Sequence, residues 1–240
     1  MTEWDASDAQ LELRLRTWAI PAALLVGFFL VAIVPSLVRI FFSMWVHEIG
    51  HAATAWMCGY LAFPGPWLTP TASRQSLFFE LLVLGGLAAG AVWAFRQERP
   101  VLGRSLIAVA AVQLGCAALL GPSRARQLIV FMGDGGCLVI GTLLMLSIYT
   151  RAASQGWLRW GFLGIGAAAF ADAFSLWWGA RTDADRIPFG MNEGAGLSDP
   201  SVLSEGFGWS AGMLVHRYVA LGVVCLAVLA VSWYLGRRRA

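Results

Sequence analysis

The sequence contains few charged residues and no lysine. Charged residues occupy 13% of the 240 positions and all 17 basic residues are arginine, whereas about 25% of the residues of a soluble domain are charged. The net charge of +3 is small and spread over several segments, so no basic patch indicates a nucleic-acid partner. Hydrophobic residues make up 58% of the chain and the mean hydropathy is +0.68. This composition excludes an ordinary soluble domain and predicts an integral membrane protein built of helices.

The sequence also lacks any Cys-x-x-Cys pair. Its four cysteines, Cys58, Cys116, Cys137 and Cys225, all lie in apolar runs. We therefore expect them to pack as small hydrophobic residues without forming disulfides. Cys58 and Cys137 are close enough in sequence to the candidate site residues described below that a thiolate ligand stays open.

Long apolar runs fill nearly the whole chain. They predict an all-α, polytopic transmembrane helix bundle of six or seven spans, with residues 1–240 forming a single membrane-embedded domain. No length remains for a separate soluble domain. The runs cover about residues 17–38, 40–62, 76–95, 102–121, 127–149, 157–178 and 214–235.

Two segments between the runs are irregular. Residues 63–75 are rich in proline and cannot continue a helix, so they form either a re-entrant or interfacial piece or an ordinary connector. Residues 179–213 are polar and rich in glycine, which predicts a flexible, water-facing loop. The basic tail Arg237–Arg239 favours a cytoplasmic C-terminus. Exclusive use of arginine is typical of a GC-rich bacterial genome, which makes the bacterial inner membrane the expected location.

The chain has only three histidines, and two of them stand four residues apart in an apolar run. His47 and His51 would share one face of a helix, so both imidazoles could reach a single ion. Glu48 follows the first histidine and would act on a water bound to that ion. The His-Glu-x-x-His pattern predicts a Zn²⁺ site for hydrolysis inside a membrane.

A catalytic zinc site needs a third protein ligand from another segment. The candidates within the apolar runs are Glu80, Asp134, Asp172 and His216. Asp134 is favoured, because its flanking glycines let another helix approach the carboxylate; the alternative for Asp134 is pairing with a buried arginine. Glu80 is explained by a helix start, Asp172 lies near the end of its span, and His216 is interfacial or an oxyanion donor.

These residues resemble the site-2-protease-type intramembrane zinc metalloproteases. His47-Glu48-Ile49-Gly50-His51 is similar to the first motif of that family, and Asp134-Gly135 to the Asp-Gly of its second motif. The resemblance implies that His47, His51 and Asp134 bind zinc and that Glu48 is the catalytic carboxylate. It places a metalloprotease core within residues 40–149. The asparagine and proline that the family usually has shortly before its Asp-Gly are missing, as in a short, divergent bacterial member.

The expected function is hydrolysis of peptide bonds in or near the transmembrane segments of protein substrates. A helical substrate hides its carbonyl groups in its own hydrogen bonds, so we expect membrane-protein substrates whose spans contain weak helix formers. The alternative is a non-catalytic metal-binding membrane protein, either a metal transporter or a pseudoprotease scaffold. A purely structural bundle would leave Glu48 and the two histidines unexplained.

The predicted spans also raise a question of depth. If every run crosses the membrane, the helices that carry His51 and Asp134 begin at opposite faces. With about 1.5 Å per residue in a core of about 30 Å, these side chains would miss each other by roughly 4–9 Å in depth. A shifted helix end, a tilt or a re-entrant segment would have to close this gap.

Overall fold

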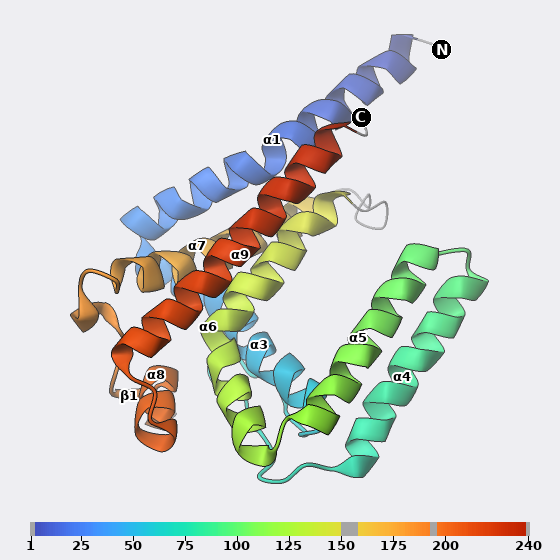
Figure 1. Cartoon of the computed structure of the whole chain (residues 1–240). Coiled ribbons are helices and arrows are strands. Elements are labelled where there is room, and N and C mark those ends of the chain that lie inside the picture. The colour runs from blue at the N-terminus through green and yellow to red at the C-terminus, as the bar shows by residue number, and fades with distance from the viewer. Residues whose placement is uncertain (1–2, 150–157, 193–195, 239–240) are drawn as a thin grey trace.

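A computed structural model describes residues 3–149, 158–192 and 196–238, and its architecture is an all-α helical bundle (Figure 1). The only strand pairing within these residues is a two-residue antiparallel hairpin and one isolated bridge. The elements are α1 (Glu3–Ile33), α2 (Pro35–Val38), the π-helix η1 (Arg39–Ser43), α3 (Met44–Met57), α4 (Leu77–Arg96), α5 (Pro100–Leu119), α6 (Pro122–Leu146), η2 (Ser147–Tyr149), α7 (Leu158–Gly179), η4 (Ala184–Arg186), β1 (Met191–Asn192), β2 (Gly196–Leu197), α8 (Asp199–Ser201), the π-helix η5 (Val202–Gly206) and α9 (Ala211–Arg238).

Five helices of the described chain are long and apolar enough to cross a membrane, as expected of an integral membrane protein. They are α4, α5, α6 with η2, α7 and α9. The apolar part of α1, Thr17–Ile33, is shorter than a usual span, and the histidine-bearing α3 has only 14 residues. The seven apolar runs of the sequence are thus all largely helical, but in two of them the apolar stretch of regular α-helix is shorter than a usual span.

The first predicted helix, residues 17–38, is divided at Val34. This residue has φ −132° and ψ 54°, outside the helical region, and Pro35 starts the next helix. Proline fits the first turn of a helix, where its missing N–H group is not needed. From Pro35 onward α2, η1 and α3 follow one another without a non-helical residue. The His-Glu-x-x-His motif therefore lies in a second continuous helical segment, which begins at Pro35.

The loop after α3 folds back on itself. Gly59 adopts φ +77° just beyond the end of α3, a conformation that glycine adopts without strain. Residues 60–76 then form a narrow hairpin in which Ala62 pairs with Thr71 and the Phe63 N–H donates to the Pro70 carbonyl at 3.1 Å. The proline-rich segment is thus an ordered hairpin loop.

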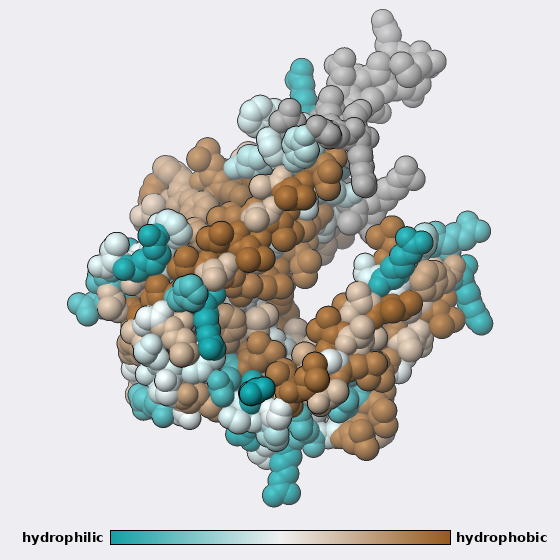
Figure 2. All heavy atoms as spheres, in the orientation of Figure 1, coloured by the Kyte–Doolittle hydropathy of each residue, from teal (hydrophilic) through white to brown (hydrophobic). Residues whose placement is uncertain are grey.

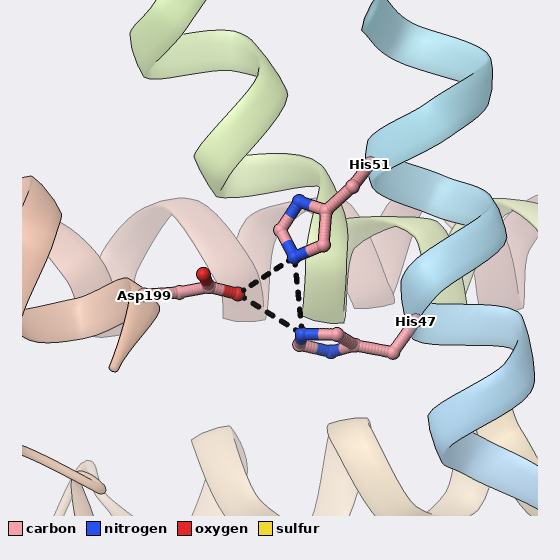
Figure 3. Close-up of side chains that lie close together, drawn as sticks. All are labelled: His47, His51 and Asp199. Carbon is pink, nitrogen blue, oxygen red and sulfur yellow. Dashed lines mark hydrogen bonds and ion pairs between the residues drawn. The ribbon is translucent and has the colours of Figure 1, made fainter. Parts of the chain in front are cut away.

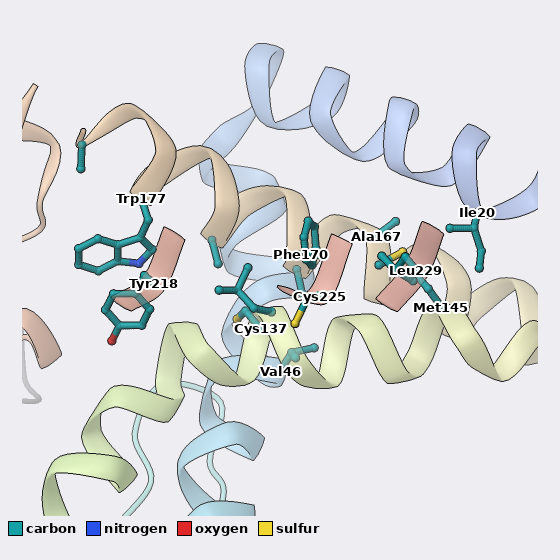
Figure 4. Packing of buried hydrophobic residues seen from close by; sticks show 14 of the residues in the cluster. Ile20, Val46, Cys137, Met145, Ala167, Phe170, Trp177, Tyr218, Cys225 and Leu229 are labelled. Atoms are coloured by element: carbon teal, nitrogen blue, oxygen red, sulfur yellow. The ribbon is translucent and has the colours of Figure 1, made fainter. Parts of the chain in front are cut away.

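The main hydrophobic core lies among α1, α6, α7 and α9 (Figure 4). Its largest fully buried side chains include Trp177, Phe170 and Met145. Trp177 stacks on Tyr218 with ring centroids 4.1 Å apart, and Tyr218 stacks on Phe131 at 4.3 Å. This column of aromatic rings joins α7, α9 and α6 directly beside the candidate site.

Helices α3 and α6 cross at two glycines. A Cβ atom on Gly50 would lie 2.1 Å from the Met132 carbonyl oxygen, and one on Gly136 would lie 2.6 Å from the Gly50 Cα. Only glycine permits this separation of the two backbones. The crossing places the His47 turn of α3 against the Asp134 turn of α6, so the depth mismatch expected from the sequence does not occur.

Helices α4 and α5 form a hairpin that diverges from the rest of the molecule (Figure 1). Only 11% of the apolar window of each helix is buried inside the protein. Figure 2 shows an opening between this hairpin and the main body, with mostly apolar residues on both sides. Such surface is stable in contact with lipid and unstable in water, which is the physical reason for placing the hairpin in the membrane.

The segment between α7 and α9 contains more structure than the flexible loop expected for residues 179–213. It includes the turn η4, the hairpin β1–β2 and the short helices α8 and η5. Ser201 Oγ accepts from the Gly190 N–H at 2.8 Å and lies 3.2 Å from Ser198 Oγ, which joins the hairpin to α8. These bonds position Asp199, the first residue of α8.

Candidate metal centre

His47 and His51 project from one face of α3 (Figure 3). Their Nε2 atoms lie 3.2 Å apart, and their ring planes are inclined at 84°. This is the geometry that a spacing of four residues gives on an α-helix. The sequence-based expectation that both imidazoles can reach one ion agrees with this arrangement.

The remaining ring nitrogen of each histidine fixes its tautomer. His51 Nδ1 is 2.7 Å from the Ile129 carbonyl oxygen, which can only accept, so this nitrogen must carry the hydrogen. His47 Nδ1 is 3.0 Å from Asp134 Oδ1, and an ionised carboxylate likewise only accepts. In the neutral imidazoles both Nε2 atoms are therefore unprotonated, and their lone pairs point into the same small space.

Asp199 completes this group from α8. Its Oδ2 atom lies 3.0 Å from His47 Nε2 and 3.1 Å from His51 Nε2 (Figure 3). With both histidines neutral, Asp199 Oδ2 is a buried atom that accepts no hydrogen bond. Burial alone would raise the pKa of Asp199, whereas a positive charge at His51 or His47 lowers it below its usual range. An ionised Asp199 therefore requires a cation beside it, either a proton on an imidazole or a metal ion bound by the neutral imidazoles.

The three atoms fit a zinc ion. Their separations of 3.0, 3.1 and 3.2 Å are close to the edge of about 3.3 Å expected between ligands of a tetrahedral site with bonds of about 2.05 Å. Three electron-pair donors at this distance are favourable only with a cation among them, which is a metal ion when both imidazoles are neutral. Two imidazoles and one carboxylate are a common ligand set for catalytic zinc.

Gly133 makes room for this convergence. A Cβ atom at this position would lie 2.5 Å from Asp199 Oδ2 and 2.6 Å from His47 Nε2. The sequence reasoning attributed the glycines around Asp134 to close helix approach. The structure supports that reason for Gly136, while Gly133 leaves space for the ligand atoms themselves.

Asp134 lies at the opposite nitrogen of His47 and not between the two imidazoles. Its Oδ1 atom accepts from His47 Nδ1 at 3.0 Å and from Arg39 Nη1 at 3.2 Å, and its Oδ2 atom accepts from Trp177 Nε1 at 2.8 Å. The structure therefore does not join Asp134, His47 and His51 into one ligand set. Asp134 therefore lies next to a motif histidine and pairs with a partly buried arginine.

A second group of potential ligands consists of His47, Asp134 and Cys137. The Asp134 oxygens already accept three hydrogen bonds, and the Cys137 thiol is 3.5 Å from the Ser43 carbonyl oxygen. A metal there would displace His47 Nδ1–H from Asp134 and leave Arg39 without that partner. The group formed with Asp199 requires no such exchange, so it is the better candidate for a metal centre.

Arg39 connects this centre to α7. Its Nη1 atom also lies 3.1 Å from Asp172 Oδ2, so one guanidinium bridges Asp134 and Asp172. Arg39 is shared by Asp134 and Asp172, whereas Asp199 and Glu48 have no arginine partner among the described residues. This excess of negative charge in the interior favours binding of a cation.

Glu48 faces the same centre from α3 and is held by the hairpin loop. The Thr69 hydroxyl lies 2.7 Å from Glu48 Oε2 and 3.0 Å from the Glu48 carbonyl oxygen. Glu48 is 4% exposed. The proline-rich loop thus carries a side chain that orients the carboxylate predicted to act as a base.

A cavity of about 420 Å³ leads from this centre to the surface. Glu48, His51 and Asp199 line its inner part. The outer walls come from the hairpin loop, the start of α6 and the segment around η5, and they include Leu68, Thr69, Thr71, Ser73, Arg126, Ile129, Val130, Val202 and Phe207. The cavity gives a small extended molecule access to Glu48 and to the Nε2 side of His51.

The other candidate residues lie elsewhere. Glu80 is in the first turn of α4, as a helix start explains, and Asp172 pairs with Arg39. His216 lines a separate cavity between η4 and α9, and Cys58 is buried in a small cluster at the C-terminal end of α3. Within the described chain, none of these four reaches the Nε2 atoms of the two motif histidines.

Asp199 was not among the residues predicted from the sequence, because it lies outside the apolar runs. The segment Ser198-Asp199-Pro200 does carry a local signal. Pro200 in the first turn and an acidic first residue are typical of a helix start. A helix start predicted inside the polar loop would have indicated that the Asp199 carboxylate is held in a fixed position. It would not have shown which residues Asp199 contacts.

Comparison with known proteins gives no match to a family model, to a curated protein or to a solved structure. The chemistry of the site therefore rests on its geometry.

Proposed function

We propose that this protein is a zinc-dependent peptide hydrolase of the membrane, similar in kind to the site-2-protease-type enzymes. One observation carries the proposal: His47 Nε2, His51 Nε2 and Asp199 Oδ2 converge within 3.2 Å beside Glu48, at the inner end of an open cavity. Asp199 takes the ligand position that the sequence resemblance gave to Asp134. Asp134 instead orients His47 through its Nδ1 atom.

In this proposal each residue of the site has a separate role. When bound, zinc would polarise the scissile carbonyl group and lower the pKa of its water toward about 7. Glu48 takes a proton from the attacking water and passes it to the leaving amide nitrogen. Thr69 keeps the Glu48 carboxylate in one orientation through its hydroxyl group. Arg39 and Trp177 hold Asp134, so that His47 keeps its Nε2 lone pair aimed at the metal.

The hydrogen bonds of a helix favour an unwound substrate. The carbonyl groups inside a helix are already bonded to N–H groups of the same helix. A transmembrane substrate must therefore unwind before its carbonyl group reaches the centre. Spans that contain glycine, proline or other weak helix formers near the cleaved bond would do so at the least cost.

The proposal keeps the expected location in a bacterial inner membrane. The arginine-rich end at Arg237–Arg239 supports a cytoplasmic C-terminus. A cysteine introduced after Ala240 should react with a membrane-impermeant maleimide only after the cells are opened.

The function is tested by comparing wild type with Glu48→Gln in detergent micelles. We expect both proteins to bind one zinc ion per chain, and only wild type to cleave peptides derived from glycine-containing transmembrane segments. A chelator should abolish the cleavage. Addition of zinc after the chelator has been removed should restore it. Zinc binding without cleavage in wild type would instead favour the non-catalytic alternative, a transporter or pseudoprotease scaffold. Undiminished cleavage by Glu48→Gln would refute the role of Glu48.

A further inference from the structure

The rim of the cavity carries one arginine among its described lining residues, Arg126. Its Nη2 group donates to the Ser73 carbonyl oxygen in the hairpin loop. A guanidinium has five N–H donors, so this bond anchors the side chain and leaves further donors for another acceptor. The remaining rim is largely neutral, with Leu68, Thr71 and Phe207 among its members.

Arg126 lies on the same stripe of α6 as the metal centre. Residues 126, 129, 130 and 133 follow the helical spacing of one face. Ile129 holds His51 through its carbonyl group, and Gly133 abuts His47 and Asp199. Arg126 and the residues at the centre are thus two ends of one continuous wall.

The spacing of this wall sets a register for a bound peptide. Seven residues of α6 separate Arg126 from Gly133, which is about 10.5 Å along the helix axis. An extended peptide advances about 3.3 Å per residue. A group contacting Arg126 therefore lies about three residues from the bond at the metal centre.

We propose that Arg126 selects substrates bearing a carboxylate two to four residues from the cleaved bond, a specificity that rests on the proposed function. A carboxylate is the acceptor that matches a guanidinium, because two parallel N–H···O bonds can form. The carboxylate belongs either to an acidic side chain or to a free C-terminus. A transmembrane segment whose apolar span is followed by an aspartate, a glutamate or a chain end would present such a group.

The test measures kcat/KM for quenched-fluorescent peptides that differ at one position. Glutamate, glutamine or lysine is placed at each of the five positions on either side of the cleaved bond, and a parallel set compares a free with an amidated C-terminus. Wild type should favour glutamate or the free carboxylate roughly three- to tenfold at one position two to four residues from the bond. The side-chain and C-terminal sets distinguish the two sources of the carboxylate.

Variants at the rim separate charge recognition from a structural effect. Arg126→Gln should lose the preference, and Arg126→Glu should reverse it in favour of lysine at the same position. Arg124→Gln, an exposed arginine of the same turn outside the cavity, should keep the wild-type preference. A preference that survives in Arg126→Glu, or that is absent from wild type, would overturn the inference.

Binding distinguishes failure of this inference from failure of the proposed function. The same peptides are titrated against zinc-loaded Glu48→Gln by fluorescence anisotropy, with and without Arg126→Glu. A charge preference in the dissociation constants without any cleavage by wild type would support Arg126 and reject the hydrolase. Cleavage without a charge preference in either measurement would reject the role of Arg126 alone.

Discussion

His47 contacts a carboxylate at each of its two ring nitrogens. Asp199 lies at Nε2 and Asp134 at Nδ1, both at 3.0 Å. The two acids therefore have different relations to a metal: one can bind it and the other orients a ligand. A sequence shows that acids are present in or near the spans, but not which nitrogen of a histidine each one faces.

This difference predicts unequal effects of two substitutions on zinc affinity. Asp199→Ala removes a ligand, so we expect zinc binding to fall below detection at micromolar zinc. Asp134→Asn keeps the shape of the side chain and should weaken zinc binding by roughly 10- to 100-fold. Competition with a fluorescent chelator measures both constants, with the exposed Asp185→Asn as a control from the same segment. Equal loss of affinity in both variants would contradict the assignment.

Gly133 supports a second prediction at this scale. Gly133→Ala would place a methyl group against Asp199 Oδ2 and His47 Nε2, so zinc binding should be lost while the helices still form. Gly135→Ala is the matched control, because its Cβ would meet only side-chain atoms, the nearest 3.1 Å away. Chelator competition and circular dichroism of both variants check this. Full zinc affinity in Gly133→Ala would show that the ligands meet elsewhere.

At the scale of the element, the π-helix η1 precedes the motif helix and carries Arg39. π-Helical turns are rare in proteins and frequent at functional sites. Here the turn places one guanidinium between α6 and α7, where it contacts Asp134 and Asp172. The apolar runs 17–38 and 40–62 leave Arg39 between them, and nothing in the sequence indicates its contacts. Neither the hydrophobic periodicity nor the composition of the sequence reveals a single π-helical turn.

Replacing Arg39 tests the importance of this bridge. Arg39→Met leaves two carboxylates without their shared cation. Breaking a fully buried ion pair costs about 3–5 kcal/mol, and a smaller loss is expected here because the Arg39 side chain is 30% exposed. We expect a clearly lower unfolding temperature in detergent, and partial recovery when Asp172→Asn is added. The control Arg96→Met, at the exposed end of α4, should change stability by no more than about 0.5 kcal/mol. An Arg39→Met protein as stable as wild type would mean that Asp134 and Asp172 do not depend on Arg39 to balance their charge.

The elements also show why the site was only partly predictable. The four-residue spacing of His47 and His51 is a local property of a helix, and the structure has it as expected. The position of Asp199 depends on a hairpin, a short helix and the crossing of α3 with α6 at Gly50 and Gly136. Such a position depends on contacts between distant segments, which a single sequence does not encode in any local pattern.

At the scale of the whole molecule, the chain divides into a packed body and the α4–α5 hairpin (Figure 1). The all-α bundle was predictable, because apolar runs of about 20 residues can satisfy their backbone groups in a bilayer only as helices. The sequence did not show that α4 and α5 stand apart, since both are apolar on every side. The candidate metal centre lies within the body, where α3, α6 and the α8 segment meet.

The position of the metal ion tests this account most directly. An anomalous difference map recorded at the zinc edge, from crystals of the zinc-loaded protein, locates the ion without reference to activity. We predict one peak between His47 Nε2, His51 Nε2 and the Asp199 carboxylate, about 2 Å from each atom. A peak between His47 Nδ1, Asp134 and Cys137, or no peak within bonding distance of Asp199, would contradict it.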